Sequence, residues 1–594
     1  MVKPVLFVLG QSALPLARKL REPLGAEIHT PDCVAGGDVT YAKATVHLGQ
    51  LFTEGRIIIG LCAAGILIRA IAPHLKDKRT EPPVIALVED GSSAVPLLGG
   101  HHGANDLARR LAELLNGHAA ITTASEVRFG FALDDPLPGF TLANPQHMKP
   151  ATAAILNGAA LALRGSHTPV TATLQPWQPG FEGITLNVTD HSEEGSATEL
   201  IYHPRTLVMG LGCERHAEPH ELVALAERVL SDHRLAPASL AAVTSIDIKT
   251  DETAINAVAA HFGVPARFFT AETLARETPR LKNPSEIVAK EVGVPGVAEA
   301  AALAGAGSDS GLIVEKTRSD RGTCAIARAG HPLLDVGGRA RGIVHVVGLG
   351  PGTPDWRAPA ARAALEASTD WVGYGLYLDL AADVKSSQME HRFPLGGEED
   401  RVRHAIKLAK DGKEVSLICS GDAGIYAMAA LVYEVIDLEP SRIAVNVIPG
   451  ISAFQAAAAK AGAMIGHDFC CISLSDLLTP WEAIEKRVKA AAEGDFVISF
   501  YNPRSLKRRD QLERAFAILS AHRPADTPVV IASNLGRPEE QVKILRFSDF
   551  NPDDVDMLTL VMVGSSQSRQ FTRGDGKAYA YTPRGYAKKR EAAE

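Results

Sequence analysis

The sequence repeats one local pattern: a short run of β-branched and other apolar residues, a turn containing glycine, and then a stretch rich in alanine and leucine. VLFVLG precedes SALPLARKL, IIIGLCAAG precedes ILIRAIAPHL, and VHVVGLGPG precedes PAARAALEA. Such apolar runs are typical of strands buried on both faces of a largely parallel sheet, and the stretches after them are typical of the covering helices. The pattern predicts an α/β chain built from several such units.

Two changes in composition mark domain boundaries. From 134 to 203 the pattern gives way to segments rich in proline, glycine and acidic residues, and the string over 320–342 leads to a new strand at Ile343. At roughly 150 residues per domain, a chain of 594 residues has room for about four. We therefore predict an α/β domain over 1–130, a connecting domain over 131–204, a second α/β domain over 205–330 and a larger unit over 342–585.

Composition excludes several classes of function. Sixty-one basic residues against 69 acidic ones give a net charge of −8, and aromatic residues make up only 5%, so nucleic acid is not an expected partner. The seven cysteines contain no C-x-x-C pair and fit neither a zinc site nor a disulfide framework, so we expect no metal and a cytoplasmic location. The most apolar stretch, IIIGLCAAGILI, is shorter than the roughly 20 residues that span a bilayer, so we expect no membrane segment.

In the C-terminal unit, glycines follow a strand-like run directly. Gly348, Gly350 and Gly352 are spaced G-x-G-x-G, and Pro351 among them lacks a backbone donor, which disfavours a dinucleotide-binding dehydrogenase. This loop alone fits a structural turn, a nucleotide-type site or another role. Four more strand-to-turn junctions follow in the same unit: SGDAG, PGISA, FYNPRS and SNLG. Because ligands bind beyond the carboxyl ends of parallel strands, five such turns predict a ligand-binding cleft.

The ordered motifs of this unit carry a family resemblance. VGLGPGTPD, VGYGLYLDL, CSGDAGIYAMA, IPGISAFQAAAAKAG, ISLSDLLTPW, SFYNPRS and TPVVIASNLGRPEE resemble the tetrapyrrole (class III) S-adenosylmethionine methyltransferases of cobalamin biosynthesis, in particular the precorrin-3B C-17 subgroup. The resemblance covers about 342–585 and implies two α/β lobes around a cleft, a homodimer, and S-adenosylmethionine as cofactor. It implies methylation of precorrin-3B, or of cobalt-precorrin-3, at C-17 with ring contraction to precorrin-4. Methylation of another ring carbon or another substrate stays an alternative.

The same resemblance implies roles for particular residues. Contacts with the methyl donor are implied for Pro351, Gly421, Asp422, Ser452, Ala453, Tyr501, Asn534 and Leu535. The glycines of the first loop, Gly348, Gly350 and Gly352, are expected nearer the macrocycle. Acidic groups of the macrocycle make basic residues candidates to bind it, namely Arg504, Lys507, Arg508 and Arg509; a solvated helix face explains the KRR run equally well. Ring contraction calls for an acid or a base, for which His345, Asp355 and Asp379 are open candidates.

In the N-terminal half, VPLLGGHHGANDLARRLAELL predicts a strand, a glycine turn and a helix with Asn105 as its N-cap. His101 and His102 lie in that turn, where a general-base role and plain solvent exposure are both open. Basic residues around a second glycine-rich turn are further candidates to bind acidic groups: Arg69, Lys76, Lys78 and Arg79.

Motifs over about 1–330, among them GILIRAIAPHLKDKRTEPPVIALVEDG, LVMGLGCERHAEPHEL and VTSIDIKTDE, resemble cobalt-precorrin-5A hydrolase. The resemblance implies opening of a lactone with release of acetaldehyde. No G-x-S-x-G motif supports a serine nucleophile. The candidate catalytic residues are therefore His101, His102 and Glu126, with Asp247, Lys249 and Glu252 beside them, although surface charges or helix caps explain the last four equally well. The alternative is a non-catalytic module that binds or hands over tetrapyrrole intermediates.

Overall fold

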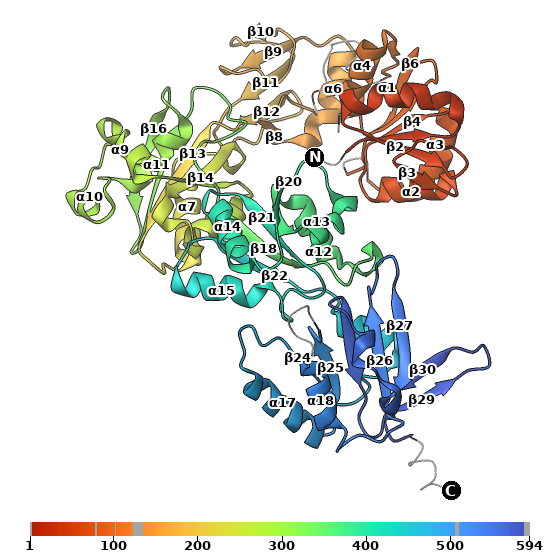
Figure 1. Ribbon diagram of the computed structural model, residues 1–594. Helices are drawn as coiled ribbons and strands as arrows, with labels where there is room; N and C mark the ends of the chain where they lie inside the picture. Colours follow the sequence, from red (N-terminus) through yellow and green to blue (C-terminus); the bar gives the residue numbers. More distant parts are fainter. Residues whose placement is uncertain are drawn as a thin grey trace. The chain divides into compact units, whose positions relative to one another are not determined.

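The computed structural model describes residues 3–77, 80–100, 103–122, 133, 135–504 and 510–586. The chain forms two compact units, Met1–Gly338 and Arg339–Glu594 (Figure 1). Both units combine helices with sheets, which confirms the α/β class. None of the helices in the described part of the chain has both the length and the apolar composition needed to cross a membrane.

The first sheet has seven strands in the order β3-β2-β1-β4-β5-β6-β7. Its central strands are buried at every residue because α1 and α4 pack on one face and α2 and α3 on the other. The strands from β3 to β5 are parallel, whereas β6 runs antiparallel to β5. The elements are β1 (Val5–Val8), α1 (Leu14–Leu24), β2 (Glu27–Pro31), β3 (Val39–Tyr41), α2 (Ala44–Thr53), β4 (Ile58–Leu61), α3 (Ala64–Ile71), β5 (Val84–Leu87), β6 (Ser93–Leu98), α4 (Ala104–Leu115) and β7 (His118–Ala119).

A smaller sheet follows with the order β10-β9-β11-β12-β8. One helix, α6, packs against its apolar face together with the buried ring of Tyr202. The hydroxyl of Tyr202 donates to the carbonyl of Leu133 at 2.6 Å, so this buried hydroxyl has a hydrogen-bond partner. The elements are β8 (Phe140–Leu142), α6 (Met148–Leu156), β9 (Leu161–Arg164), β10 (Gln175–Pro176), β11 (Ile184–Val188) and β12 (Glu199–Pro204).

The third sheet of this unit has the order β15-β14-β13-β17-β16. Gly210 lies in its central strand, and a Cβ there would clash with the backbone of α11 at Ala298, so glycine lets the helix pack closely on the sheet. The elements are β13 (Leu207–Cys213), α7 (Pro219–Asp232), β14 (Leu240–Ile246), α8 (Thr253–Phe262), β15 (Ala266–Phe269), α9 (Ala271–Ala275), α10 (Glu286–Val292), α11 (Val297–Ala306), β16 (Gly311–Arg318) and β17 (Gly322–Arg328).

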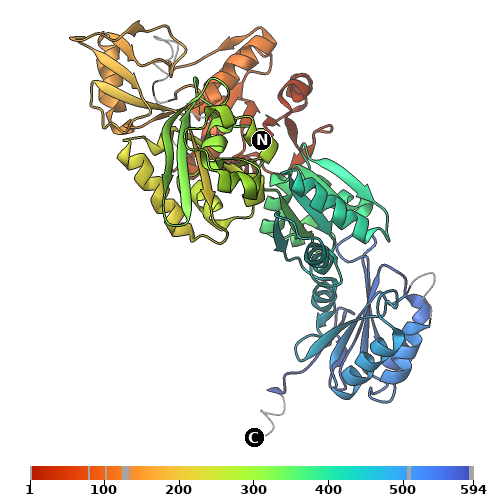
Figure 2. The ribbon, with the colours of Figure 1, turned by 90° about the vertical axis from the view of Figure 1, so that its left-hand side faces the viewer.

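The second unit begins with a fully parallel sheet of order β20-β19-β21-β18-β22. Helices α14 and α15 lie on one side of this sheet and α12 and α13 on the other (Figure 1). Figure 2 shows the same ribbon turned by 90°. Side chains of β18 alternate between the two faces: Val344 and Val346 pack under α14 and α15, whereas Val347 packs under α12 and α13. The elements are β18 (Ile343–Gly348), α12 (Pro359–Ala367), β19 (Asp370–Tyr374), α13 (Gly375–Asp379), β20 (Met389–Phe393), α14 (Glu398–Lys410), β21 (Glu414–Cys419), α15 (Met428–Leu438) and β22 (Ala444–Ile448).

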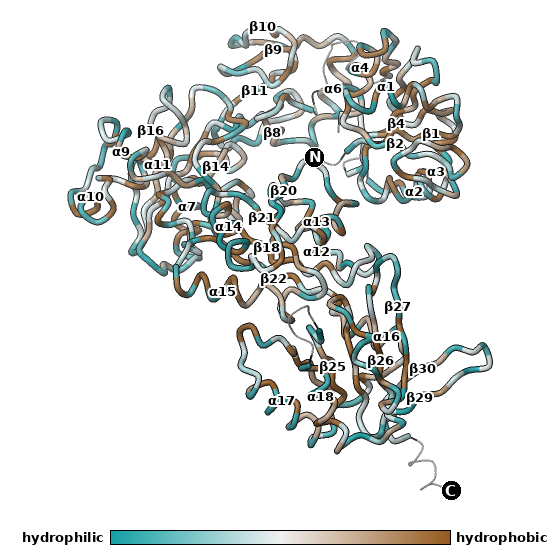
Figure 3. The backbone as a smooth tube through the Cα atoms, viewed as in Figure 1, coloured by the Kyte–Doolittle hydropathy of each residue, from teal (hydrophilic) through white to brown (hydrophobic). Residues whose placement is uncertain are grey.

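The second lobe of this unit has a mixed sheet of order β24-β25-β28-β26-β27 and a small sheet of order β23-β30-β29. Apolar residues concentrate in the strands of the mixed sheet, where they meet α16, α17 and α18 (Figure 3). The elements are α16 (Ala453–Ala461), β23 (Gly462–Ala463), β24 (Phe469–Ser473), α17 (Trp481–Glu493), β25 (Val497–Tyr501), α18 (Gln511–Leu519), β26 (Pro528–Ser533), β27 (Gln541–Arg546), β28 (Thr559–Val563), β29 (Arg569–Thr572) and β30 (Ala578–Tyr581).

Candidate functional site

Three loops at the carboxyl ends of neighbouring strands converge in the second unit. Gly350, after β18, and Gly421, after β21, exchange two backbone hydrogen bonds of 3.0 and 2.8 Å. Both residues have positive φ, +80° and +68°, which favours glycine. A Cβ on Gly348 would lie 2.7 Å from the carbonyl oxygen of Gly421 and 2.8 Å from the nitrogen of Gly450. The glycines therefore let the backbones of three loops meet without intervening side chains, and we call this meeting point the glycine cradle.

Asp422 holds two of these loops together. One carboxylate oxygen accepts from the backbone nitrogen of Gly424 at 2.8 Å, and the other accepts from that of Gly450 at 3.1 Å. Each carboxylate oxygen has a further lone pair, so the side chain can fix the loops and still accept a hydrogen bond from a ligand.

Tyr501, at the end of β25, binds the start of α16. Its hydroxyl lies 2.6 Å from Oγ of Ser452 and accepts from the backbone nitrogen of Phe454 at 3.2 Å. Ser452 is buried and forms a capping box with Gln455, which explains why the PGISAFQ segment begins a helix there. Burial raises the pKa of Tyr501 to about 12, so its hydroxyl is neutral at physiological pH.

Tyr426 is a residue of this site that the motif analysis missed. Its φ of +53° is unusual for a residue with a side chain and costs about 1–3 kcal/mol unless surrounding contacts maintain it. Its hydroxyl donates to the carbonyl of Cys471 in β24 at 2.8 Å, and its ring lies 5.2 Å from that of Tyr501. Tyr426 thus joins the loop after β21 to the second lobe.

The loop after β26 contacts the loops after β18 and β21. Asn534 has a φ of +51° and Leu535 is buried beside it. Nε of Arg537 donates to the carbonyl of Pro351 at 3.2 Å, and its Nη2 donates to Oγ of Ser420 at 2.9 Å. The motif analysis missed Arg537 as well, although it lies inside the quoted segment TPVVIASNLGRPEE.

The structure brings the implied donor residues together at the ends of five strands, β18, β21, β22, β25 and β26. They are Pro351, Gly421, Asp422, Ser452, Ala453, Tyr501, Asn534 and Leu535, with Gly348, Gly350 and Gly352 in the first loop. Their contacts with a donor or a macrocycle stay predictions.

The basic and acid–base candidates are placed differently. Arg504 binds the carbonyl of Pro552 at 2.8 Å and the carboxylate of Asp553 at 2.7 Å, whereas Lys507, Arg508 and Arg509 lie outside the described residues. His345 is buried in β18 between Glu414 (2.9 Å) and Asn446 (3.2 Å). Asp379 pairs with Arg392 at 2.8 Å, and the exposed Asp355 lies in the turn after the first glycine loop.

In the first unit, the catalytic candidates His101, His102 and Glu126 lie outside the described residues, as do Lys78 and Arg79. The expectation that Asn105 caps the following helix is wrong. Gly103, with a φ of +90°, takes the cap position, and the buried Asn105 is the second residue of α4. A glycine adopts the left-handed cap conformation without strain, and the cap therefore lies two residues earlier than the sequence suggests.

The acidic candidates of the third sheet form an ion-pair network at the ends of β13 and β14. Glu252 is buried; it accepts from the backbone nitrogen of His216 at 2.9 Å and pairs with Lys249 at 3.1 Å and Arg215 at 3.5 Å. Asp247 opens the short turn after β14. Glu252 is therefore paired with Lys249 of its own loop, and its contacts with Arg215 and His216 join the end of β14 to that of β13.

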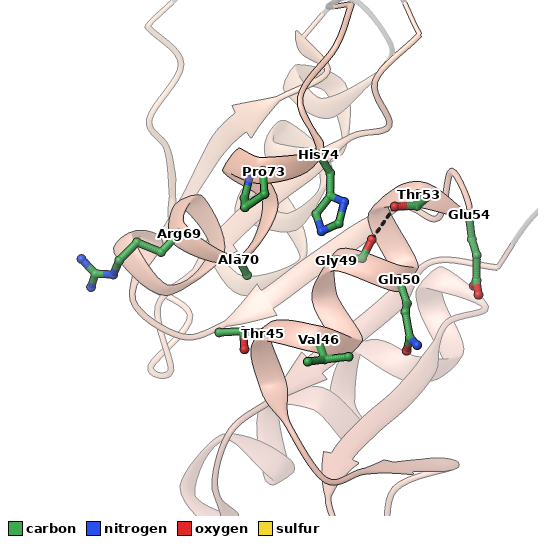
Figure 4. A pocket seen from close by; sticks show the side chains of 10 residues that line it. All are labelled: Thr45, Val46, Gly49, Gln50, Thr53, Glu54, Arg69, Ala70, Pro73 and His74. Atoms are coloured by element: carbon green, nitrogen blue, oxygen red, sulfur yellow. Dashed lines mark hydrogen bonds between the residues drawn. The ribbon is translucent and has the colours of Figure 1, made fainter.

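A groove of about 560 Å³ lies between α2 and α3 of the first sheet (Figure 4). Apolar or small residues line much of it, including Val46, Gly49, Ala70 and Pro73. The side chain of Arg69, a candidate to bind acidic groups, points away from the groove (Figure 4). The groove is thus a mainly apolar surface feature. Elsewhere in the described residues, no group of three or more His, Cys, Asp or Glu side chains is placed to bind a metal ion.

Comparisons with known proteins match three regions of the chain. The family described as "Tetrapyrrole (Corrin/Porphyrin) Methylases" matches residues 343–550, "Cobalamin synthesis G C-terminus" matches 207–327, and "Cobalamin synthesis G N-terminal" matches 46–126. A "Probable cobalt-factor III C(17)-methyltransferase" of Salmonella typhimurium is 43% identical over 244 residues, which are 41% of this chain and 99% of that protein.

A second relative and two solved structures match parts of the chain. "Cobalamin biosynthesis protein CobIJ" of Mycobacterium tuberculosis is 43% identical over 258 residues, or 42% of this chain, and the chain spans only 50% of that protein's length. Among solved structures, the methyltransferase CobJ is 39% identical and covers 41% of this chain and 100% of its own, with a TM-score of 0.38. CobE, a protein of the cobalamin pathway, is 37% identical over 21% of this chain and 94% of its own, with a TM-score of 0.20.

Proposed function

The chain belongs to the tetrapyrrole (corrin/porphyrin) methylases, and on that premise we propose that its C-terminal unit transfers a methyl group from S-adenosylmethionine to C-17 of precorrin-3B or its cobalt form. Relatives named precorrin-3B and cobalt-factor III C(17)-methyltransferase, each covered over 98% or more of its length, support the substrate. The product would be the ring-contracted precorrin-4. The single observation that carries the proposal is the meeting of five strand-end loops around a glycine cradle.

The residues of the cradle fit the donor. Gly348 and Gly450 let the loop backbones pack where a Cβ would collide, and Gly421 adopts a positive φ that favours glycine. Carbonyl oxygens and the carboxylate of Asp422 suit a cationic ligand. Ser452 caps α16 and Leu535 follows β26, so both belong to the second lobe. S-adenosylmethionine supplies an electrophilic methyl group on its sulfonium. The chain then has to align two reactants and exclude water, because methyl transfer needs position more than a nucleophilic side chain.

We expect Tyr501 to hold the start of α16 in place and not to transfer a proton. A hydroxyl with a pKa of about 12 stays protonated at neutral pH, and its hydrogen bonds to Ser452 and Phe454 keep the start of α16 in place. The proposed enzyme is a cytoplasmic homodimer that takes a tetrapyrrole substrate.

For the N-terminal unit we propose lactone hydrolysis of cobalt-precorrin-5A with release of acetaldehyde, supported by the two cobalamin synthesis G matches. A binding or hand-over module is the second candidate. The observation that favours it is the pairing of Glu252 with Lys249 and Arg215, which leaves these groups engaged with one another.

The test of the first activity is incubation of the purified chain with S-adenosylmethionine and precorrin-3B, with and without cobalt, followed by mass spectrometry. A product heavier by one methylene group supports the proposal, and the absence of any methylated species contradicts it. For the second activity, acetaldehyde release from cobalt-precorrin-5A is measured for the wild type and for His101→Ala and His102→Ala. Release by the wild type that both substitutions leave unchanged removes the histidines as catalytic residues, and no release by the wild type favours the hand-over module.

A further inference from the structure

Two arginines near the carboxyl ends of the parallel strands of the second unit lack an acidic partner among the described residues. Arg401, in the first turn of α14, is 3% exposed; its Nη2 donates to the carbonyl of Pro394 at 3.0 Å, and its Nε has no partner. Arg537 is half-buried and, within the residues that the structure describes, donates to Pro351 and Ser420. Within the described ranges, no carboxylate oxygen lies within 4.0 Å of either guanidinium.

Most other buried or half-buried arginines of the same unit have an acidic partner, although Arg341 binds the carbonyls of Arg442 and Ile443 instead. Arg357 pairs with Asp383 at 2.9 Å, Arg504 with Asp553 at 2.7 Å and the fully buried Arg523 with Asp495 at 2.9 Å. A buried cation without a counter-charge is unfavourable, because it loses water and gains no opposite charge in return. Two guanidiniums without a carboxylate partner at one edge of the same sheet would be stabilised by an anion from outside the chain.

The place is the edge of the candidate site. Pro394 follows β20, Ser420 follows β21 and Pro351 lies in the first glycine loop, so both arginines contact the carboxyl ends of the strands. Gly352 keeps the position open, because a Cβ there would lie 2.5 Å from Cγ of Arg537.

Tyr377 of α13 lies within the electrostatic reach of both cations. Burial raises the pKa of its hydroxyl, and the positive charges of Arg537 and Arg401 oppose that rise. The same surroundings would attract a stronger anion such as a carboxylate.

We propose that Arg537 binds a carboxylate of the bound ligand, with Arg401 supplying a second, buried positive charge at the same edge of the sheet. Since Nε and Nη2 each donate one hydrogen bond within the chain, both N–H bonds of Nη1 and one of Nη2 remain for the ligand. The inference rests on the proposed methyl transfer, in which two carboxylate sources exist: the methionine group of the donor and the acidic side groups of the macrocycle.

The experiment compares Arg537→Met with the matched control Arg403→Met. Arg403 lies on α14 like Arg401 and is half-buried like Arg537, but it is paired with Glu399 and Glu439, so its loss changes the net charge equally without removing an unpaired guanidinium. Three probes are titrated by calorimetry or fluorescence: S-adenosylhomocysteine, methylthioadenosine, which lacks the amino-acid group, and uroporphyrin III, which carries many carboxylates. Thermal unfolding checks that both variants fold, and Arg537→Lys replaces Arg537→Met if the latter does not.

Loss of a charged hydrogen bond predicts binding weaker by about tenfold or more for the carboxylate-bearing probe. If the donor provides the carboxylate, S-adenosylhomocysteine loses affinity for R537M and methylthioadenosine does not. If the macrocycle provides it, uroporphyrin III alone loses affinity. If the affinity of R537M for every probe lies within about twofold of that of R403M, the proposed carboxylate subsite is wrong, whereas the proposed methyl transfer is not affected. A wild type that binds none of them contradicts both the subsite and the proposed function.

Discussion

Replacing Gly348 by alanine is the sharpest perturbation of the glycine cradle. The added Cβ would lie 2.7 Å from the carbonyl oxygen of Gly421, 2.8 Å from the nitrogen of Gly450 and 3.0 Å from that of Ala423, and all three atoms are backbone. Ordinary contact begins at 3.4 Å, so the nearest atom has to move by about 0.7 Å. No flexible side chain can absorb this shift, and the three loops must separate.

The size of the effect follows from that displacement. Overpacking of this kind costs about 1–3 kcal/mol of stability. A misplacement approaching 1 Å at a site that works by alignment lowers the rate by about 100-fold, so we expect kcat/KM of Gly348→Ala to fall by about 10- to 100-fold.

The assay is methyl transfer under initial-rate conditions together with calorimetric binding of S-adenosylhomocysteine. The matched control is Gly574→Ala, because nothing lies within 4 Å of a Cβ at that position and its φ is not in the left-handed region. Rates and affinities of Gly348→Ala equal to those of Gly574→Ala would refute the view that close backbone packing forms the donor site.

Three further predictions concern single contacts. Tyr501→Phe leaves the buried Phe454 nitrogen unpaired and should destabilise the second unit by about 1–3 kcal/mol in urea unfolding, whereas Tyr433→Phe, on an exposed tyrosine, should change little. Asp422→Asn replaces one acceptor by a donor facing a backbone N–H, and we expect S-adenosylhomocysteine to bind about tenfold more weakly in calorimetry, unlike after Asp437→Asn. Burial alone would raise the pKa of Asp370, but hydrogen bonds from His391, Lys413 and Thr369 outweigh it and hold that pKa below its usual range. The ionised carboxylate of Asp370 therefore stabilises the folded protein fully above its unfolded pKa of about 3.9, and this stabilisation is lost as pH falls through its pKa in the folded protein. In thermal melts at acid pH, the wild type should therefore lose more stability than Asp370→Asn.

The alternating pattern was sufficient for the α/β class but not for strand direction. Apolar runs such as those of β5 and β26 look the same whether a neighbouring strand runs parallel or antiparallel, and both strands have antiparallel neighbours. Strand direction depends on how long connections return, which a local period does not encode.

Much of the candidate site could be read from motifs because its glycines and its capping serine are local features. Gly348 and Ser452 serve their own loop or helix end. Arg537 and Tyr426 escaped notice because their roles depend on partners 186 and 45 residues away, Pro351 and Cys471. Such contacts depend on how the two lobes pack in three dimensions, and the spacing of residues within either segment does not predict them.

The most direct test of the central claim uses S-adenosylmethionine labelled with carbon-13 in its methyl group. The full chain is incubated with precorrin-3B, and the product is examined by carbon NMR. The account predicts one labelled methyl group attached to C-17 of a ring-contracted product. A label on any other ring carbon, or an unlabelled tetrapyrrole, would contradict it.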